Sequence, residues 1–475
     1  MQASTEKDTS ASRHSFQEAV ARGKEARKVV PRSSQANWEP GPDRVGPLEV
    51  LAEQDEARVP ELVPVRYGRM LASAFTFYRG AAAIMAADLA ASPDSGLRVQ
   101  LCGDAHLSNF GVFQAPDRQL VFDINDFDET LPGPFEWDVK RLAASIAIGA
   151  RDRGFKGQER EAAVLAGVSA YRTAMAEFAA MNEIDVWYSR LAVADIVGRW
   201  QQKVTKEDRR RFEKNVAKAR NKGSLRALEK LTEVRDGELR IASRPPLLLP
   251  IGELAEREGQ DVAEIAARMM RLLDEYRGTL DDQASVLAGR YHYVDAAHKV
   301  VGVGSVGTRA FIALLLGRDE GDPLFLQIKE AGPSVLEPFA GAGGFRHHGH
   351  RVVAGQRLTQ AASDVLLGWL TAEGLDGKKR DFYVRQLWDG KGSAEIESMQ
   401  PETMAGYAGL CGWSLARAHA RTGDRQKIAA YLGKSDTFDR AIAEFSEAYA
   451  DQNETDYEVL LGAQRDGRLA VDSGV

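Results

Sequence analysis

The feature that most constrains the fold is a polar stretch enclosed by short apolar segments. Residues 103–109 read GDAHLSN, and segment 97–102 before them alternates apolar and polar residues as a β-strand does. Residues 110–122 contain two apolar runs around a turn that Pro116 and Asp117 favour, so they predict a β-hairpin. Because a hairpin returns the chain to its start, the polar stretch and the acidic residues after the hairpin are expected to lie together.

The residues that this hairpin gathers suit phosphoryl transfer. Asp104 can accept a proton from an attacking hydroxyl or orient it, and His106 lies close by in the same stretch. Asn109 and either Asp123 or Asp126 supply the hard oxygen ligands that Mg²⁺ prefers, and the hairpin length leaves the choice of carboxylate open. A polar turn whose acidic residues merely cap a helix is the alternative, since short motifs have many chance matches.

Length, charge and cysteine content restrict the remaining possibilities. A chain of 475 residues exceeds what one core usually serves and predicts two or three structural units. The net charge of −7 gives no argument for a nucleic-acid or membrane partner. Cys102 and Cys411 are too few for a disulfide framework, so a reducing cytoplasm is the expected compartment. We find no apolar run of membrane-spanning length and no signal-peptide core.

A second motif lies far downstream. Gly302, Gly304, Ser305 and Gly307 form a GxGxxG loop, whose glycines allow backbone amides to close over phosphates. A dinucleotide-binding fold requires a helix after such a loop, but here a short apolar segment, a turn and another apolar strand follow. That order is typical of a kinase nucleotide lobe, and it places Lys329 at the end of the third strand to contact phosphates. An ordinary surface lysine is the alternative.

Both motifs resemble those of known phosphotransferases. Residues 103–109 resemble the catalytic loop of aminoglycoside phosphotransferases and related kinase-like enzymes, GDxHxxN, and residues 121–123 resemble their metal-binding aspartate strand. The resemblance implies that Asp104 is the catalytic aspartate, that Asn109 and Asp123 bind metal, and that ATP and Mg²⁺ are the cofactors. Nearly the whole chain also resembles a bacterial domain-of-unknown-function family, number twenty-two fifty-two, which implies no substrate.

The order of the motifs departs from that of kinases, in which the glycine loop and the lysine precede the catalytic loop. Here they follow it by about two hundred residues, and circular permutation explains the difference. The expected fold is therefore α+β, a circularly permuted, protein-kinase-like two-lobed fold with a mainly helical catalytic lobe and a small β-rich nucleotide lobe. Segment 412–424 resembles the helix before a catalytic loop, but Ala429 stands where that loop needs Asn, so the loop at Asp104 is the working one.

A kinase lysine pairs with a glutamate, and two candidates lie near Lys329. Glu337 is preferred, because Glu330 directly follows Lys329 and points to the opposite face if the strand continues. Asp138, near the start of a long helix, is expected to cap that helix and can also brace the catalytic loop. Further helices are expected at 48–53, 67–91 and 356–370, and a polar loop at 347–350.

These features divide the chain into five expected parts. In order they are a partly disordered N-terminal arm, a catalytic lobe, a basic helical insertion, a nucleotide-binding lobe, and C-terminal helices that complete the catalytic lobe: residues 1–65, 66–195, 196–285, 286–400 and 401–475. The basic stretch 199–230 is better explained by a solvated helical face than by a surface for acidic partners.

Three classes of function remain. The first is an ATP- and Mg²⁺-dependent phosphotransferase that acts on a small-molecule or protein hydroxyl acceptor. The second is a kinase-like nucleotide-binding protein that transfers a nucleotidyl group or regulates without catalysis. The third is a hydrolase that uses the Asp and His cluster without nucleotide. The joint presence of Asp104, Asn109 and Lys329 favours catalysis over scaffolding.

Overall fold

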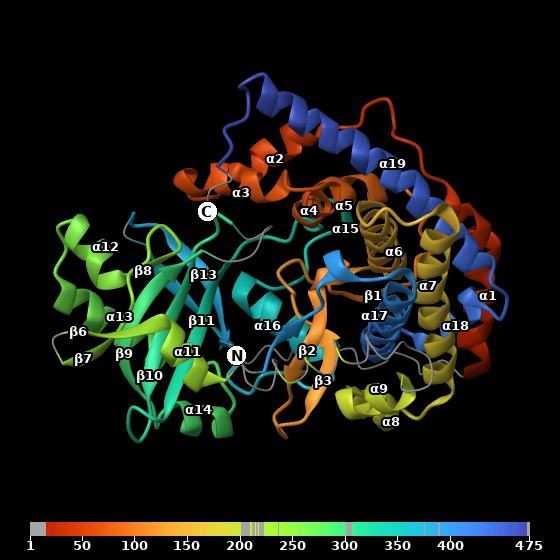
Figure 1. Ribbon diagram of the computed structural model, residues 1–475. Coiled ribbons are helices and arrows are strands. Elements are labelled where there is room, and N and C mark those ends of the chain that lie inside the picture. Colours follow the sequence, from red (N-terminus) through yellow and green to blue (C-terminus); the bar gives the residue numbers. More distant parts are fainter. Residues whose placement is uncertain are drawn as a thin grey trace, which may run out of the picture.

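The computed structural model describes residues 16–200, 210, 214, 217, 223–235, 237–300, 306–374, 376–387 and 390–472. Helices make up 54% and strands 17%, so the chain is a mixed α+β protein in which helices predominate, as the sequence predicts (Figure 1). Residues 1–15, which are expected to be disordered, lie outside the described residues, and so do most residues of the basic stretch 199–230.

The helices divide between an N-terminal segment, a large helical body and a smaller set around a sheet (Figure 1). Their bounds are α1 (Phe16–Val29), η1 (Arg32–Ala36), α2 (Pro47–Asp55), η2 (Pro60–Leu62), α3 (Val63–Met70), α4 (Ala74–Gly80), α5 (Ala82–Ala90), η3 (Leu107–Asn109), α6 (Phe135–Asp152), α7 (Gly157–Ala180), α8 (Glu183–Tyr188), α9 (Val193–Trp200), α11 (Ser224–Leu231), α12 (Ile251–Arg257), α13 (Val262–Arg277), α14 (Asp282–Ala288), α15 (Glu337–Ala340), α16 (His348–Thr359), η4 (Ile396–Ser398), α17 (Pro401–Thr422), α18 (Arg425–Leu432) and α19 (Thr437–Arg465).

Strands form four separate sheets within the described residues. Their bounds are β1 (Arg98–Leu101), β2 (Phe110–Gln114), β3 (Leu120–Ile124), β4 (Leu131–Pro134), β5 (Leu191–Ala192), β6 (Thr232–Arg235), β7 (Glu238–Ile241), β8 (Leu248–Pro250), β9 (His292–Lys299), β10 (Ala310–Leu316), β11 (Pro323–Ala331), β12 (Gly368–Glu373), β13 (Lys379–Gln386) and β14 (Gly392–Ser393).

The helical body is built around α6, which is buried from Phe135 to Ala150 and therefore lies at the centre of the largest core. A helix that is buried on all sides must be surrounded by other helices, and α7, α17 and α19 surround this one (Figure 1). The axes of α7 and α17 approach closely because both carry glycine at the contact. A Cβ atom on Gly412 would lie 2.1 Å from the carbonyl oxygen of Gly167.

The largest sheet is antiparallel and has the order β12-β13-β11-β10-β9-β8. Both of its faces are buried, because successive residues of β10 enter different cores. Ile312 and Leu314 pack in a cluster that includes residues of α11, whereas Ala313 and Leu315 pack in a cluster that includes residues of α13. Helix α16 contacts this sheet on one side and α17 on the other, so it joins the sheet to the helical body (Figure 1).

The predicted hairpin is present and has the register that brings its two ends together. Strands β2 and β3 pair with Phe110 opposite Ile124. The Asn125 amide donates to the Asn109 carbonyl at 2.8 Å, which closes the open end of the hairpin. The polar stretch 103–109 and the acidic residues after β3 therefore lie side by side, as predicted.

Several expected elements have different bounds in the structure. Segment 67–91 is not one helix, because a capping box at Ser73 starts a new helix after α3. The N-terminal arm is more helical than expected and includes α1. The loop expected at 347–350 instead begins α16, because the His347 side chain accepts the His350 amide and caps the helix. The helix expected at 356–370 ends at Thr359, and β12 follows.

Among the described residues, we find no helix whose length and apolar character would let it cross a bilayer.

Candidate functional site

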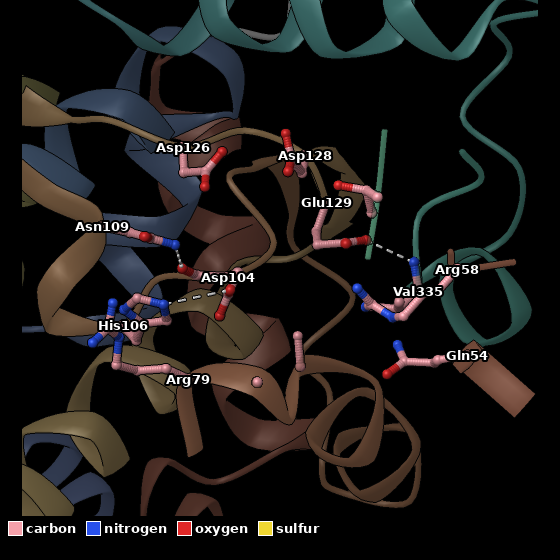
Figure 2. Close-up of a pocket in the computed structure, with 13 residues that line it drawn as sticks. Gln54, Arg58, Arg79, Asp104, His106, Asn109, Asp126, Asp128, Glu129 and Val335 are labelled. Atoms are coloured by element: carbon pink, nitrogen blue, oxygen red, sulfur yellow. Dashed lines mark hydrogen bonds and ion pairs between the residues drawn. The ribbon is translucent and has the colours of Figure 1, made fainter. Parts of the chain in front are cut away.

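A pocket of about 190 Å³ lies where the N-terminal segment, the polar stretch 103–109 and the end of the hairpin meet (Figure 2). Its lining combines carboxylates, two arginines and a few neutral groups: Gln54, Arg58, Arg79, Gly80, Ala82, Asp104, His106, Asn109, Asp126, Asp128, Glu129, Thr308 and Val335. Of the residues predicted for catalysis and metal binding, Asp104, His106, Asn109 and Asp126 lie together here.

Asp104 lies at the centre of this pocket and is held in one orientation by Arg141 of α6. The Arg141 Nε donates to Asp104 Oδ1 at 2.9 Å. Arg141 is itself fixed, because its guanidinium donates to the Tyr78 carbonyl at 2.8 Å and lies 3.9 Å from the centre of the Tyr78 ring. The other Asp104 oxygen lies 3.6 Å from His106 Nε2. Burial lowers the pKa of His106 to about 3, against the attraction of Asp104, so the imidazole is neutral at pH 7.

The loop before Asp104 is fixed by Asp138, also on α6. The Asp138 carboxylate accepts the amides of Cys102 at 2.8 Å and Gly103 at 3.0 Å, and His419 Nε2 donates to it at 3.1 Å. Asp138 therefore braces the start of the polar stretch 103–109, and the expectation that it caps its own helix is wrong. Gly103 has φ of +85°, and a Cβ atom there would lie 2.3 Å from the Glu129 carbonyl oxygen, so the close approach of the two loops requires glycine.

Asn109 has its amide oriented by the same loop. Its Nδ2 donates to the Asp104 carbonyl at 2.8 Å (Figure 2). Because the nitrogen is the donor in this bond, the side-chain oxygen is left to accept a hydrogen bond or to bind a cation. This is the orientation that a metal-binding asparagine needs.

The two candidate metal aspartates have different surroundings. Asp126 lines the pocket, whereas Asp123 is buried outside it. Both Asp123 oxygens accept from Arg417 Nη2, at 2.6 and 2.7 Å, and one also accepts the Ala361 amide at 3.1 Å. These bonds leave Asp123 no free direction toward Asn109. Of the two predicted candidates, Asp126 is therefore the carboxylate that shares the pocket with Asn109.

Lys329 of β11 extends from the large sheet to the carboxylates of Asp126 and Asp128, which we call the acidic group. Its Nζ contacts Asp128 Oδ2 and lies 3.9 Å from Asp126 Oδ1, although Lys329 and Asp128 are 201 residues apart in the chain. Tyr383 of β13 donates to the other Asp128 oxygen at 2.8 Å. Burial acts to lower the pKa of Lys329, but Asp126 and Asp128 outweigh it and raise that pKa above its usual range. Lys329 is therefore a buried, charged ammonium and not a surface lysine.

Glu337 does not pair with Lys329, and the predicted pairing is wrong. Its Oε1 accepts the Ser334 amide at 3.3 Å and lies 4.0 Å from Arg351 Nε, because α15 holds it near the start of α16. Glu330 points to the opposite face of the sheet, as expected, and pairs with Arg309 at 3.3 Å. The partner of Lys329 is Asp128, and the sequence signal that could have found it is the repetition of Asp at positions 126 and 128.

The end of the glycine loop reaches this pocket, although Gly302, Gly304 and Ser305 lie outside the described residues. Thr308 lines the pocket, and Gly307 beside it has φ of +89°. The Gly307 carbonyl accepts the Val59 amide at 2.8 Å, and Arg58 donates to the Val306 carbonyl. The N-terminal segment thus fixes the last residues of this loop.

Sequence reasoning missed the residues that the N-terminal segment contributes. Gln54, Arg58 and Arg79 come from α2, the turn after it and α4, and they form the wall of the pocket that lies away from Asp126 (Figure 2). No motif surrounds them, so the sequence gives no local signal. An arginine next to a Pro-rich arm and another within an Ala-rich helix are ordinary surface residues until the tertiary structure brings them to the pocket.

Comparison with known proteins identifies the family of the chain but indicates no reaction. The model of a family described as uncharacterised proteins conserved in bacteria (DUF2252) matches residues 58–463. A search of the curated proteins and a search of the solved structures each found no match to the chain. The matched range includes every pocket residue except Gln54.

Proposed function

The chain belongs to this bacterial family, DUF2252, whose description gives no activity, and from the site itself we propose an ATP- and Mg²⁺-dependent phosphotransferase that acts on a hydroxyl acceptor. The observation that carries the proposal is that Lys329 contacts Asp128 and lies close to Asp126. Both aspartates line the same pocket as Asp104 and Asn109. A catalytic carboxylate, metal-binding oxygens and a phosphate-binding ammonium are the parts that phosphoryl transfer requires.

The arrangement of the sheet supports a kinase-like nucleotide lobe. Strands β9, β10 and β11 form a meander, α16 follows, and β12 and β13 complete the sheet beside β11. Protein kinases carry their phosphate-binding lysine on the third strand of the nucleotide lobe, after the glycine-rich loop, and Lys329 has that position. Because this lobe follows the catalytic loop in the chain, the proposal includes a two-lobed fold with circular permutation.

The donor set fits a magnesium ion that is held largely by nucleotide phosphates. Within the described ranges, no three His, Cys, Asp or Glu residues are arranged to hold a metal by themselves. Mg²⁺ in kinases needs only one or two carboxylates, because phosphate oxygens and water complete its coordination. Asp126 and Asn109 would hold the ion, and Asp128 would keep Lys329 in place. When bound, the ion supplies charge neutralisation for the phosphoryl group.

Asp104 provides the chemistry at the acceptor. The acceptor oxygen forms a bond to the γ-phosphorus of ATP, the bond from that phosphorus to the bridging oxygen breaks, and ADP leaves. Asp104 orients the hydroxyl and accepts its proton. Arg141 holds the Asp104 carboxylate toward the pocket, and Lys329 would bind the phosphates as a point charge.

The test combines nucleotide binding with product analysis for the full chain and the variant Asp104→Asn. We expect Mg²⁺-ATP to raise the unfolding temperature of both proteins, since a ligand of the folded state stabilises it, whereas only the wild type releases ADP. Asp117→Asn, at the exposed turn of the hairpin, is the matched control and keeps full turnover. Unchanged turnover in Asp104→Asn would refute the assigned role. Release of pyrophosphate would indicate nucleotidyl transfer, and turnover without nucleotide would indicate a hydrolase.

A further inference from the structure

Arg79 lines the pocket, and the carboxylates of Glu397 and Asp104 act on its charge without forming an ion pair. Within the described part of the chain, no hydrogen bond or ion pair reaches its guanidinium, and its Nε is buried from solvent. The other arginines at the site are engaged: Arg141 binds Asp104, and Arg58 donates to the Val306 carbonyl. A half-buried arginine that makes no direct hydrogen bond has donors available to a ligand, so Arg79 is a candidate to bind an anion.

The element that carries Arg79 is rigid. Helix α4 begins at the Ser73 capping box and includes Tyr78, whose hydroxyl donates to the Arg141 carbonyl at 2.8 Å. The backbone at Arg79 is therefore held by the same contacts that position Arg141. Burial lowers the pKa of Arg79, and nearby Glu397 and Asp104 oppose that effect. An anion placed at this guanidinium would compensate the lost hydration in a geometry that the fold already fixes.

Arg79 and the acidic group lie on opposite sides of Asp104. Figure 2 shows Asp126 and Asp128 on one side of the Asp104 carboxylate, and Arg79 beside His106 on the other. In-line transfer requires the acceptor oxygen and the leaving group to lie on opposite sides of the transferred phosphorus. If the nucleotide phosphates lie at Asp126, the body of the acceptor extends from Asp104 toward Arg79.

We propose that the acceptor is a small hydroxyl compound that carries a carboxylate or phosphate, and that Arg79 binds this anionic group while Asp104 orients the hydroxyl. This inference rests on the proposed phosphotransferase function. A planar guanidinium binds either anion through two parallel hydrogen bonds, which also fixes the direction of the hydroxyl. The pocket volume of about 190 Å³ suits a compound of a few carbon atoms. The neutral His106 next to Arg79 adds no second charge, and Arg58 already has a carboxylate 3.7 Å away on Asp55, so selection for an anion depends on Arg79.

The experiment uses a matched series of probes that differ only in charge. Glycerol, glycerate and glycerol 3-phosphate are titrated against the full chain with Mg²⁺ and ADP at constant ionic strength, and thermal unfolding reports binding. We expect one or both anions to bind, glycerol not to bind, and Arg79→Gln to weaken the bound anion by at least about tenfold. The two anions distinguish a carboxylate site from a phosphate site. Arg318→Gln, which removes an exposed arginine in the turn between β10 and β11, is the control and leaves binding unchanged.

The outcomes separate this inference from the function on which it rests. Equal binding of glycerol and the anions, no binding of either anion, or equal anion binding by wild type and Arg79→Gln would each overturn it. A loss confined to Mg²⁺-ATP affinity would assign Arg79 to the nucleotide and also overturn it, while the phosphotransferase proposal would stand. Anion binding that depends on Arg79, in a protein that neither binds nor uses ATP, would support the anion site and refute the proposed function. Arg79→Lys, which keeps the charge, tests the same site if Arg79→Gln fails to fold.

Discussion

At the scale of single residues, Asp123 and Asp126 have different surroundings although only three positions separate them. Asp123 is buried and forms an ion pair with Arg417, whereas Asp126 lines the pocket. Sequence comparison alone favours Asp123, because the strand before it resembles the metal-binding strand of phosphotransferases. The deciding partner, Arg417, lies 294 residues away in the chain and carries no local signal.

We predict that Asp123→Asn and Asp126→Asn affect different properties. Asp123→Asn leaves Arg417 charged and unpaired in the core, so the free energy of unfolding falls by about 3 to 5 kcal/mol. Asp126→Asn keeps the stability within about 1 kcal/mol of wild type but abolishes Mg²⁺-dependent turnover. Denaturant unfolding and magnesium titration measure the two effects. Normal magnesium dependence in Asp126→Asn would remove this residue from the metal site.

Glu136 is a buried acid of α6 whose pKa is raised to about 7, first by burial and against the hydrogen bond from the Ser95 amide. Its unfolded value is near 4.5, so between about pH 4.5 and 7 the folded protein holds a proton that the unfolded chain has lost. The stability contribution of Glu136 is therefore complete below pH 4.5 and is lost as the pH rises through 7.

We predict that the Glu136→Gln variant does not lose this stability contribution as the pH rises. The free energy of unfolding of the variant, minus that of wild type, increases from pH 4.5 to 7 by at most about 1.4 kcal/mol per pH unit. Denaturant unfolding at several pH values measures the difference. Glu177→Gln, an exposed change on α7, is the control and gives a difference that does not vary with pH. A constant difference for Glu136→Gln as well would show that the carboxyl ionises normally.

At the scale of elements, the conformation of the polar stretch 103–109 depends on how closely two loops can approach. Gly103 and Gly96 both have positive φ, at +85° and +75°, but a Cβ on Gly103 would strike the Glu129 carbonyl, whereas Gly96 has open space around it. Alanine at either position strains the backbone, and alanine at Gly103 must also separate the loops.

We predict that Gly103→Ala lowers turnover at least about tenfold and lowers the unfolding temperature more than Gly96→Ala does. Gly96→Ala carries the strain of a positive φ alone, so it leaves turnover near the wild-type value. Steady-state rates and thermal unfolding of the two variants make the comparison. Similar losses in both would mean that backbone strain, and not loop contact, controls the site.

The elements themselves were largely predictable where the signal is local. The hairpin β2-β3 and the strands β10, β11 and β13 follow from apolar runs and turn residues. The predicted helix boundaries were wrong where the cap formed by a single side chain sets the start of a helix. Ser73 divides one Ala-rich segment into separate helices, and His347 starts a helix within a run of polar residues that resembles a loop. Such caps depend on one hydrogen bond, which periodicity does not detect.

At the scale of the whole molecule, the pair formed by Lys329 and Asp128 joins the large sheet to the helical body. The predicted approach of Lys329 to the acidic residues after the hairpin is present in the structure, but the partner predicted for the lysine was not correct. A sequence motif specifies that a lysine needs an acid, whereas the packing of α15 and α16 decides which acid is near. The contribution of the N-terminal segment could not be predicted, since it results only from the tertiary arrangement.

We predict that Lys329→Met weakens Mg²⁺-ATP binding and lowers the free energy of unfolding by about 3 kcal/mol, because Asp128 loses its buried counter-charge. The double variant Lys329→Met/Asp128→Asn removes both charges and recovers much of that stability, but not turnover. Thermal unfolding with and without Mg²⁺-ATP separates the two effects. Nucleotide binding of wild-type strength in Lys329→Met would exclude the lysine from the phosphate site.

The 201-residue separation between Asp128 and Lys329 has a consequence during synthesis. At about 5 to 20 residues per second, the lysine leaves the ribosome on the order of 10 to 40 seconds after the aspartate. Arg417, the counter-ion of Asp123, is translated later still. Until Lys329 and Arg417 are synthesised, Asp128 and Asp123 lack the counter-ions with which they are buried. The nascent N-terminal half must therefore keep these carboxylates hydrated. Translation that stops before residue 329 therefore leaves a fragment in which Asp128 lacks the cation that accompanies its burial.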